Sequence, residues 1–233
     1  MYKRQELDQF FKKDSLLILQ KKIAKQQKPQ SFNLKVTGDM SVNLKKQTGR
    51  VANIVAYKKG SDLTLQNEVI VLGAHMDHLG FGGESSMDPQ GEGKVHHGAD
   101  DNASGTALVL KLAQYFSKVE TKRSLAFVLF NAEEMGLLGS SHFVEYWKGR
   151  YQETYGLMKA MLNFDMVGRY QKEVSVMGTG SFMEKNFIHP PKVSSYKYIL
   201  KQQAIGSSDH AVFHNNKIPC LLYTSDAADD SLR

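Results

Sequence analysis

The sequence predicts an α/β fold in which helices flank a mostly parallel central sheet, giving three layers. From residue 68 onward, apolar segments of strand length alternate with segments of helical periodicity. Strands that are apolar along nearly their whole length are typical of parallel sheets covered on both faces. At 233 residues, 41% of them hydrophobic, the chain is long enough to bury one sizeable core.

The predicted elements follow one another as strand, loop and helix. The strands are rich in Val, Leu, Ile and Phe and cover residues 68–74, 124–131, 158–164 and 173–177. The helices have apolar residues recurring on one side and cover residues 104–117 and 136–147. Ligands of such sheets bind at the carboxyl ends of the strands. The loops after these strands are therefore the predicted location of a site.

The first fifty residues are organised differently. A helix is predicted over residues 14–27, where Asp14 or Ser15 can cap its first turn. Alternating apolar residues between 32 and 44 predict short strands around a turn, and residues 51–57 predict another strand. We expect residues 6–50 to form an N-terminal segment that packs on a main domain of residues 51–219.

The charge distribution argues against a nucleic-acid partner. The formal net charge is +6, but the first 60 residues hold fourteen Lys or Arg against four Asp or Glu, so the remainder is mildly acidic. A nucleic-acid binder concentrates basic charge at its site, whereas here the motif-rich part is the acidic one. The sequence also has no apolar run of about 18 residues, so we expect no membrane-spanning segment.

Both ends of the chain match translated adapter DNA of the kind used to prepare sequencing libraries. The first five residues, MYKRQ, and the segment CLLYTSDAADD from Cys220 match it in opposite orientations. We therefore expect residues 1–5 and 220–233 to lie outside the natural sequence. On this interpretation Cys220, the only cysteine, is not native, and the sheet lacks its next native strand after Pro219.

Four polar clusters follow the predicted strands or precede the first predicted helix. They are His75-Met-Asp77-His78, Asp100-Asp101-Asn102, Glu133-Glu134 and Asp165. Each cluster alone has a simpler interpretation: a buried histidine, a helix cap, or a solvated acidic pair at a helix start. All four together, each at the end of a strand, favour a functional site. The histidines without partners at ligand spacing receive no role; they are His96, His97, His142, His189 and His214.

The residue types in these clusters predict a metal site. Several carboxylates at one sheet edge repel one another unless a cation neutralises them. Imidazole and carboxylate ligands without a thiolate suit Zn²⁺, ahead of Mn²⁺ or Co²⁺. Glu133 and Glu134 point in different directions at a strand end, so one can bind metal while the other handles protons. Asp77 is spaced to hold the second ring nitrogen of His75.

In five ordered segments, the chain resembles metallopeptidase family 28. The segments are GAHMDHLG, GADDNASG, FNAEEMGLLGS, NFDMVGR and SSDHAVF. This family includes bacterial zinc aminopeptidases, glutamate carboxypeptidases, glutaminyl cyclases and transferrin receptors. The resemblance covers about residues 51–219, and it implies a zinc-exopeptidase fold with a catalytic domain in that range.

The resemblance also implies a set of metal ligands. His75 and Asp165 correspond to ligands of one zinc and Glu134 to a ligand of the other. Asp101 corresponds to the residue that bridges the two ions, with a cis peptide bond to Asn102. The family places one more histidine ligand in a Tyr-His-x-Pro-x-Asp stretch, which this sequence lacks. We therefore expect two Zn²⁺ ions per complete site and about one in this chain.

The remaining roles follow from the same resemblance. Glu133 corresponds to the general base, which takes a proton from a water held between the two metals. Asp77 is the second predicted catalytic residue, because its spacing from His75 lets it hold the other ring nitrogen of that imidazole. Asp209 and His210 match a motif that lines the substrate site.

The function that this resemblance implies is that of a metalloexopeptidase, and most closely an aminopeptidase acting on the N-terminal residues of peptides. The alternatives on the same fold are a carboxypeptidase, a glutaminyl cyclase and a non-catalytic module like the transferrin receptors. Those receptors have lost metal ligands, whereas this chain retains those that its length allows. Family members of this kind are usually exported, so we expect a periplasmic or extracellular parent protein.

Overall fold

The computed structural model of the chain describes residues 15–31, 41–43, 48–81, 93–169, 173–178, 197–201 and 208–225. The chain divides into two compact units, Met1–Gly49 and Arg50–Arg233. Each unit is described by itself.

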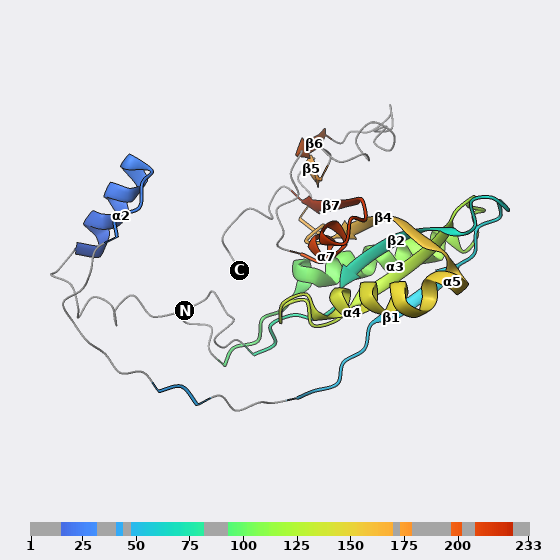
Figure 1. Cartoon of the computed structure of the whole chain (residues 1–233), viewed down its shortest axis with the longest axis horizontal. Helices are drawn as coiled ribbons and strands as arrows, with labels where there is room; N and C mark the ends of the chain where they lie inside the picture. The colour runs from blue at the N-terminus through green and yellow to red at the C-terminus, as the bar shows by residue number, and fades with distance from the viewer. Residues whose placement is uncertain are drawn as a thin grey trace. The chain divides into compact units, whose positions relative to one another are not determined.

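The first unit contains one described helix, α2, over Ser15–Gln26 (Figure 1). It ends where Gln27 takes a left-handed conformation, with φ of 51°, and Pro29 follows two residues later. The predicted helix over residues 14–27 is thus confirmed. The short strands predicted between residues 32 and 44 lie outside the described residues, except for 41–43, which form no strand.

The second unit is built on a seven-stranded sheet with the order β1-β3-β2-β4-β7-β5-β6. Its strands are β1 (Ile54–Lys58), β2 (Glu68–His75), β3 (Ser124–Phe130), β4 (Leu157–Phe164), β5 (Glu173–Met177), β6 (Lys197–Lys201) and β7 (Cys220–Ser225). The four central strands β3, β2, β4 and β7 are parallel. β1 pairs antiparallel with β3, β5 pairs antiparallel with β7, and β6 runs parallel to β5. The prediction of a mostly parallel sheet is confirmed.

Helices cover both faces of this sheet, so the three predicted layers are confirmed (Figure 1). On one face lies α3 (Gly105–Phe116); on the other lie α4 (Leu138–Tyr146) and α7 (His210–Asn215). The chain continues from α4 through a π-helical turn, Trp147–Tyr151, into the short α5 (Gln152–Tyr155). Among the described helices, none has the length and apolar character that crossing a bilayer requires.

Alternation along the central strands supplies both layers of the core. Val69 and Val71 of β2 face α4 and α7, whereas Leu72 and Ala74 of the same strand face α3. β3 is buried along its whole length and alternates in the same way. Because successive side chains of a strand point to opposite faces, a strand that is apolar along its whole length contributes side chains to the core layers on both faces of the sheet.

The residues after Pro219 form a strand of the sheet, whether or not they belong to the natural sequence. Cys220–Ser225 forms β7, which pairs parallel with β4 and antiparallel with β5. The segment CLLYTS is apolar and rich in strand-forming residues, and Leu221 is almost completely buried in the sheet. The DNA origin proposed for residues 1–5 and 220–233 stays a prediction, because a strand forms here whatever that origin is.

Two hydrogen bonds of the Asn53 side chain hold the start of α4 against the end of β3. The side chain of Asn53 donates a hydrogen bond to the carbonyl of Gly139 (2.8 Å) and accepts one from the amide of Asn131 (3.0 Å). A Cβ atom at Gly139 would overlap the carbonyl oxygen of Asn131. The two ends of the loop between Asn131 and Gly139 are therefore in direct contact with each other and with Asn53.

This contact yields a stability prediction. Gly139→Ala forces the backbone apart, so we expect it to lower the free energy of unfolding by about 1–3 kcal/mol or more. Gly149→Ala is the matched control, because nothing lies within 4 Å of the added Cβ. The control is expected to be neutral or to stabilise by about 0.4–1 kcal/mol. Urea unfolding of both variants checks this, and equal losses in the two would contradict it.

Candidate metal centre

Four of the predicted site residues follow three neighbouring parallel strands. His75 ends β2, Glu133 and Glu134 follow β3, and Asp165 follows β4. β2 lies between β3 and β4 in the sheet, so the carboxyl ends of all three strands meet at one edge. The predicted convergence of these clusters is confirmed.

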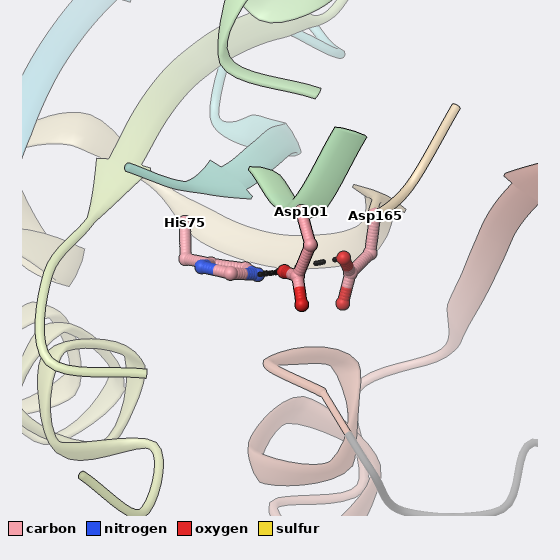
Figure 2. Close-up of side chains that lie close together, drawn as sticks. All are labelled: His75, Asp101 and Asp165. Atoms are coloured by element: carbon pink, nitrogen blue, oxygen red, sulfur yellow. Dashed lines mark ion pairs between the residues drawn. The ribbon is translucent and has the colours of Figure 1, made fainter. Parts of the chain in front are cut away.

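The first cluster joins one imidazole to two carboxylates. Nε2 of His75 lies 3.2 Å from Oδ1 of Asp101 and 3.4 Å from Oδ1 of Asp165. Figure 2 shows both carboxylates directed at the same end of the imidazole ring. One ligand atom from each of the three residues lies within 4.8 Å of the others.

These distances fit a tetrahedral zinc ion. Bonds of about 2.0–2.1 Å to nitrogen and oxygen place two ligand atoms about 3.3 Å apart along a tetrahedral edge. The two measured separations, 3.2 and 3.4 Å, lie on either side of that value. The imidazole nitrogen is therefore already spaced from both carboxylates as it would be around the ion.

The electrostatics at this edge favour a cation. Burial alone would lower the pKa of His75, which is 1% exposed, but the Asp101 and Asp165 carboxylates outweigh burial and raise the pKa to about 11. A proton held this strongly reflects the negative potential of the two carboxylates. A zinc ion in the same position would replace that proton and satisfy both of them.

Asp77 organises the neighbouring loop, and its contacts differ in detail from the expectation. Nδ1 of His75 lies 3.1 Å from the backbone carbonyl of Asp77, and the carboxylate lies farther away, at 3.8 Å. The two carboxylate oxygens instead accept hydrogen bonds from the amides of Glu133 (3.1 Å) and Glu134 (3.3 Å). One residue thus orients the imidazole through its backbone and the Glu pair through its side chain.

The turn that presents Asp101 is held from inside the protein. The Asp101–Asn102 peptide bond is cis, as the resemblance implies. The buried Asn102 side chain donates a hydrogen bond to the carbonyl of Phe164 (2.9 Å) and accepts hydrogen bonds from the amides of Gly105 (3.0 Å) and Met166 (3.3 Å). Asn102 therefore joins the turn that carries Asp101 to the strand end that carries Asp165.

Asp100 points to different partners from Asp101. Oδ1 of Asp100 accepts a hydrogen bond from the amide of Gly168 (2.7 Å), and Oδ2 lies 3.5 Å from Nε of Arg169. This geometry favours Asp101 as the ligand of the pair. Asp100 instead holds the loop that follows Asp165.

Glu133 and Glu134 have separate surroundings, as their adjacency predicts. Burial raises the pKa of Glu133 to about 8; His75 opposes this shift, and Asp209 adds to it. Burial also raises the pKa of Glu134, but its side chain lies beside His78, with Oε1 2.9 Å from Nδ1. Asp101, Glu134 and His78 form a second group whose ligand atoms lie within 4.8 Å of one another.

Asp209 and His210 lie at the start of α7 and are completely buried. Burial raises the pKa of Asp209 to about 7, against the lowering effects of the Ser140 hydroxyl and His75. Asp209 lies within electrostatic reach of His75. The substrate-lining role stays a prediction, and the burial of both side chains favours support from behind the site.

Sequence reasoning gave His78 no role. Its pairing with Glu134 spans 56 positions of the chain and depends on the path of the loop after β2. The available signal was its position three residues after the predicted ligand His75, in the loop that follows β2.

Taken together, two groups of one histidine and two carboxylates form a candidate metal centre at the carboxyl ends of the parallel strands. The model of peptidase family M28 matches residues 53–231, so the chain belongs to that family.

Characterised relatives agree with this assignment. Aminopeptidase YwaD of Bacillus subtilis is 28% identical over 182 residues, which cover 76% of this chain and 36% of that protein. Leucine aminopeptidase 2 of Arthroderma otae is 29% identical, over 79% of this chain and 36% of that protein. The chain thus spans about a third of the length of these relatives.

Solved structures show the same fold. The structure of BSAP, a zinc aminopeptidase from Bacillus subtilis, aligns with a TM-score of 0.55 and 25% identity, over 76% of this chain and 41% of that one. The glutaminyl cyclase of Fimbriiglobus ruber aligns with a TM-score of 0.54 at 15% identity, over 76% of this chain and 65% of that one, and this shows the fold alone.

The role of Asn102 gives a prediction for this region. Asn102→Ala removes three buried hydrogen bonds and leaves backbone groups unsatisfied, so we expect a loss of about 1–3 kcal/mol or more of unfolding free energy. Zinc affinity should fall as well, because Asp101 and Asp165 are no longer held together. Urea unfolding and zinc titration measure the two effects. Asn215→Ala, at an exposed position of α7, is the control and should change neither quantity.

Proposed function

We propose that this protein is a zinc-dependent metalloexopeptidase, and specifically an aminopeptidase that releases N-terminal residues from peptides. The observation that carries the proposal is the spacing of His75, Asp101 and Asp165, whose ligand atoms are arranged as around a zinc ion. Membership of peptidase family M28 and the aminopeptidase names of its relatives support the reaction class.

The metal ligands divide into two sets that share one residue. His75, Asp101 and Asp165 would hold one zinc, and three protein ligands are the usual number at a catalytic zinc. Asp101 and Glu134 would contribute to the second. When bound, zinc polarises the scissile carbonyl and lowers the pKa of the attacking water.

Glu133 is the proposed general base. Its carboxylate lies within electrostatic reach of His75, Asp165 and Glu134, and burial places its pKa at about 8. A base whose pKa lies near the working pH can accept the proton of the attacking water and pass it to the departing amine. The hydrogen bond from the amide of Glu133 to Asp77 fixes the backbone from which this side chain extends.

The alternatives on this fold differ in the substrate that they accept. An aminopeptidase needs a free α-amine, a carboxypeptidase needs a free α-carboxylate, and a cyclase needs an N-terminal glutamine. Similarity to a glutaminyl cyclase is confined to the fold. A non-catalytic module would not need a half-buried carboxylate such as Glu133 next to a complete set of metal ligands.

Three further proposals complete this picture. The parent protein acts in the periplasm or outside the cell, as exported members of the family do. The peptide is its partner, and no nucleic acid is involved. Residues 6–50 form a segment that accompanies the catalytic domain of residues 51–219.

The division of labour in the Glu pair is testable. In the full-length protein, Glu133→Gln should retain zinc but lower kcat by roughly 10²–10⁴-fold, because only the proton acceptor is lost. Glu134→Ala should lose zinc from the second position. Metal content by mass spectrometry and cleavage of leucyl-p-nitroanilide give the two readouts. Loss of zinc in Glu133→Gln, with Glu134→Ala fully loaded, would reverse the two roles.

Substrate termini separate the candidate activities. The same enzyme should cleave leucyl-p-nitroanilide but leave its N-acetylated form intact, because acetylation removes the free amine. Cleavage of a peptide with a free C-terminus and a blocked N-terminus would indicate a carboxypeptidase instead. Cyclisation of N-terminal glutamine without peptide cleavage would indicate a cyclase.

A further inference from the structure

The two metal-ligating groups have the same composition. His75 stands with Asp101 and Asp165, and His78 stands with Asp101 and Glu134. Each group thus has one imidazole and two carboxylates, and Asp101 belongs to both. Three such ligands are what a catalytic zinc commonly takes from the protein.

His78 is held in place by its surroundings. Nδ1 lies 2.9 Å from Oε1 of Glu134, and each of the two side chains is 21% exposed. Gly98, in a left-handed conformation with φ of 60°, packs against the ring: a Cβ atom there would come within 2.9 Å of Cγ of His78. The ring of His96 meets it edge-on, with centroids 6.1 Å apart. A side chain packed in this way loses little freedom on binding an ion.

The distance between His78 and Glu134 fits coordination after a small adjustment. A tetrahedral zinc would hold two such ligand atoms about 3.3 Å apart. The observed 2.9 Å is a hydrogen bond, so an ion entering between the two atoms would separate them by a few tenths of an ångström. The ring would bind through Nδ1 with its proton on Nε2, the neutral form that metals require.

From this arrangement we propose that His78 is a ligand of the second zinc, which it shares with Glu134 and Asp101. The inference rests on the proposed zinc-dependent function and deepens it. The sequence-based expectation of about one zinc in this chain counted only two carboxylates at the second position. With the imidazole of His78 added, the second position has a full set of three, and the chain binds two zinc ions.

The competing explanation is that His78 only positions Glu134 through their hydrogen bond. Two variants distinguish these roles. His78→Ala removes both the hydrogen bond and the ligand. His78→Asn places an amide NH₂ near the position of Nδ1, so it can still donate to Glu134 but cannot supply an imidazole nitrogen.

The experiment titrates the metal-free 233-residue chain with Zn²⁺ against a chromophoric chelator, and then with Co²⁺ while recording the visible absorption. The unaltered chain should take up two equivalents. Both His78 variants should keep the first equivalent at unchanged affinity. They should bind the second at least about 100-fold more weakly, since losing even an outer-shell partner costs about 10–100-fold. The visible absorption of Co²⁺ that appears with the second equivalent should change in both His78 variants.

His97→Ala is the matched control, because it removes an exposed imidazole from the same loop and should alter neither equivalent. Thermal unfolding of the metal-free variants confirms that they fold. His75→Ala should abolish the first equivalent, which tests the proposed function separately from the role of His78.

Three results would overturn the proposal. The first is uptake of a single equivalent by the unaltered chain, and the second is retention of the second equivalent by both variants. The third is retention by His78→Asn alone, which would make His78 a positioning residue. If no zinc binds even to the first group, the proposed function fails together with this inference.

Discussion

Mutual repulsion among carboxylates at one edge of the sheet is the constraint around which this domain is organised. Asp101, Glu134 and Asp165 arrive from three loops at the carboxyl ends of adjacent parallel strands, and Glu133 lies beside them. In water these groups would separate, but the apolar layers on both faces of the sheet fix where the strands end. The core therefore keeps negative charge concentrated where a cation can neutralise it. The high pKa of His75 is a direct consequence of that concentration.

The central part of this fold could be predicted from local pattern because its strands are apolar along nearly their full length. β2, β3 and β4 were located to within about one residue, and the polar residues after them identified the functional edge. β6 (Lys197–Lys201) and the six-residue α7 were not predicted. A strand with Lys at both ends and a helix of under two turns have too little periodicity to be recognised. β7 was not predicted, because its residues were assigned to a segment outside the natural sequence and their strand-forming character was not considered.

The site shows the same division between local and non-local information. His75, Asp101, Glu134 and Asp165 stand in short motifs that a sequence displays directly. His78 pairs with Glu134 only because two loops from neighbouring strands meet, and the hydrogen bonds of Asn102 likewise join residues more than sixty positions apart. Such contacts are properties of the assembled sheet edge. They become visible only when strand order and register are known.

Asp77 contacts both His75 and the backbone of the Glu133-Glu134 pair. Its carbonyl faces the imidazole of the first ligand group, while its carboxylate binds the backbone of both glutamates on the next strand's loop. A displacement at this one residue would shift a metal ligand and the proposed proton acceptor in concert. Asp77 thus links the orientation of the His75 ring to the backbone of the Glu pair, so a change at position 77 would affect affinity for the ion and proton transfer together.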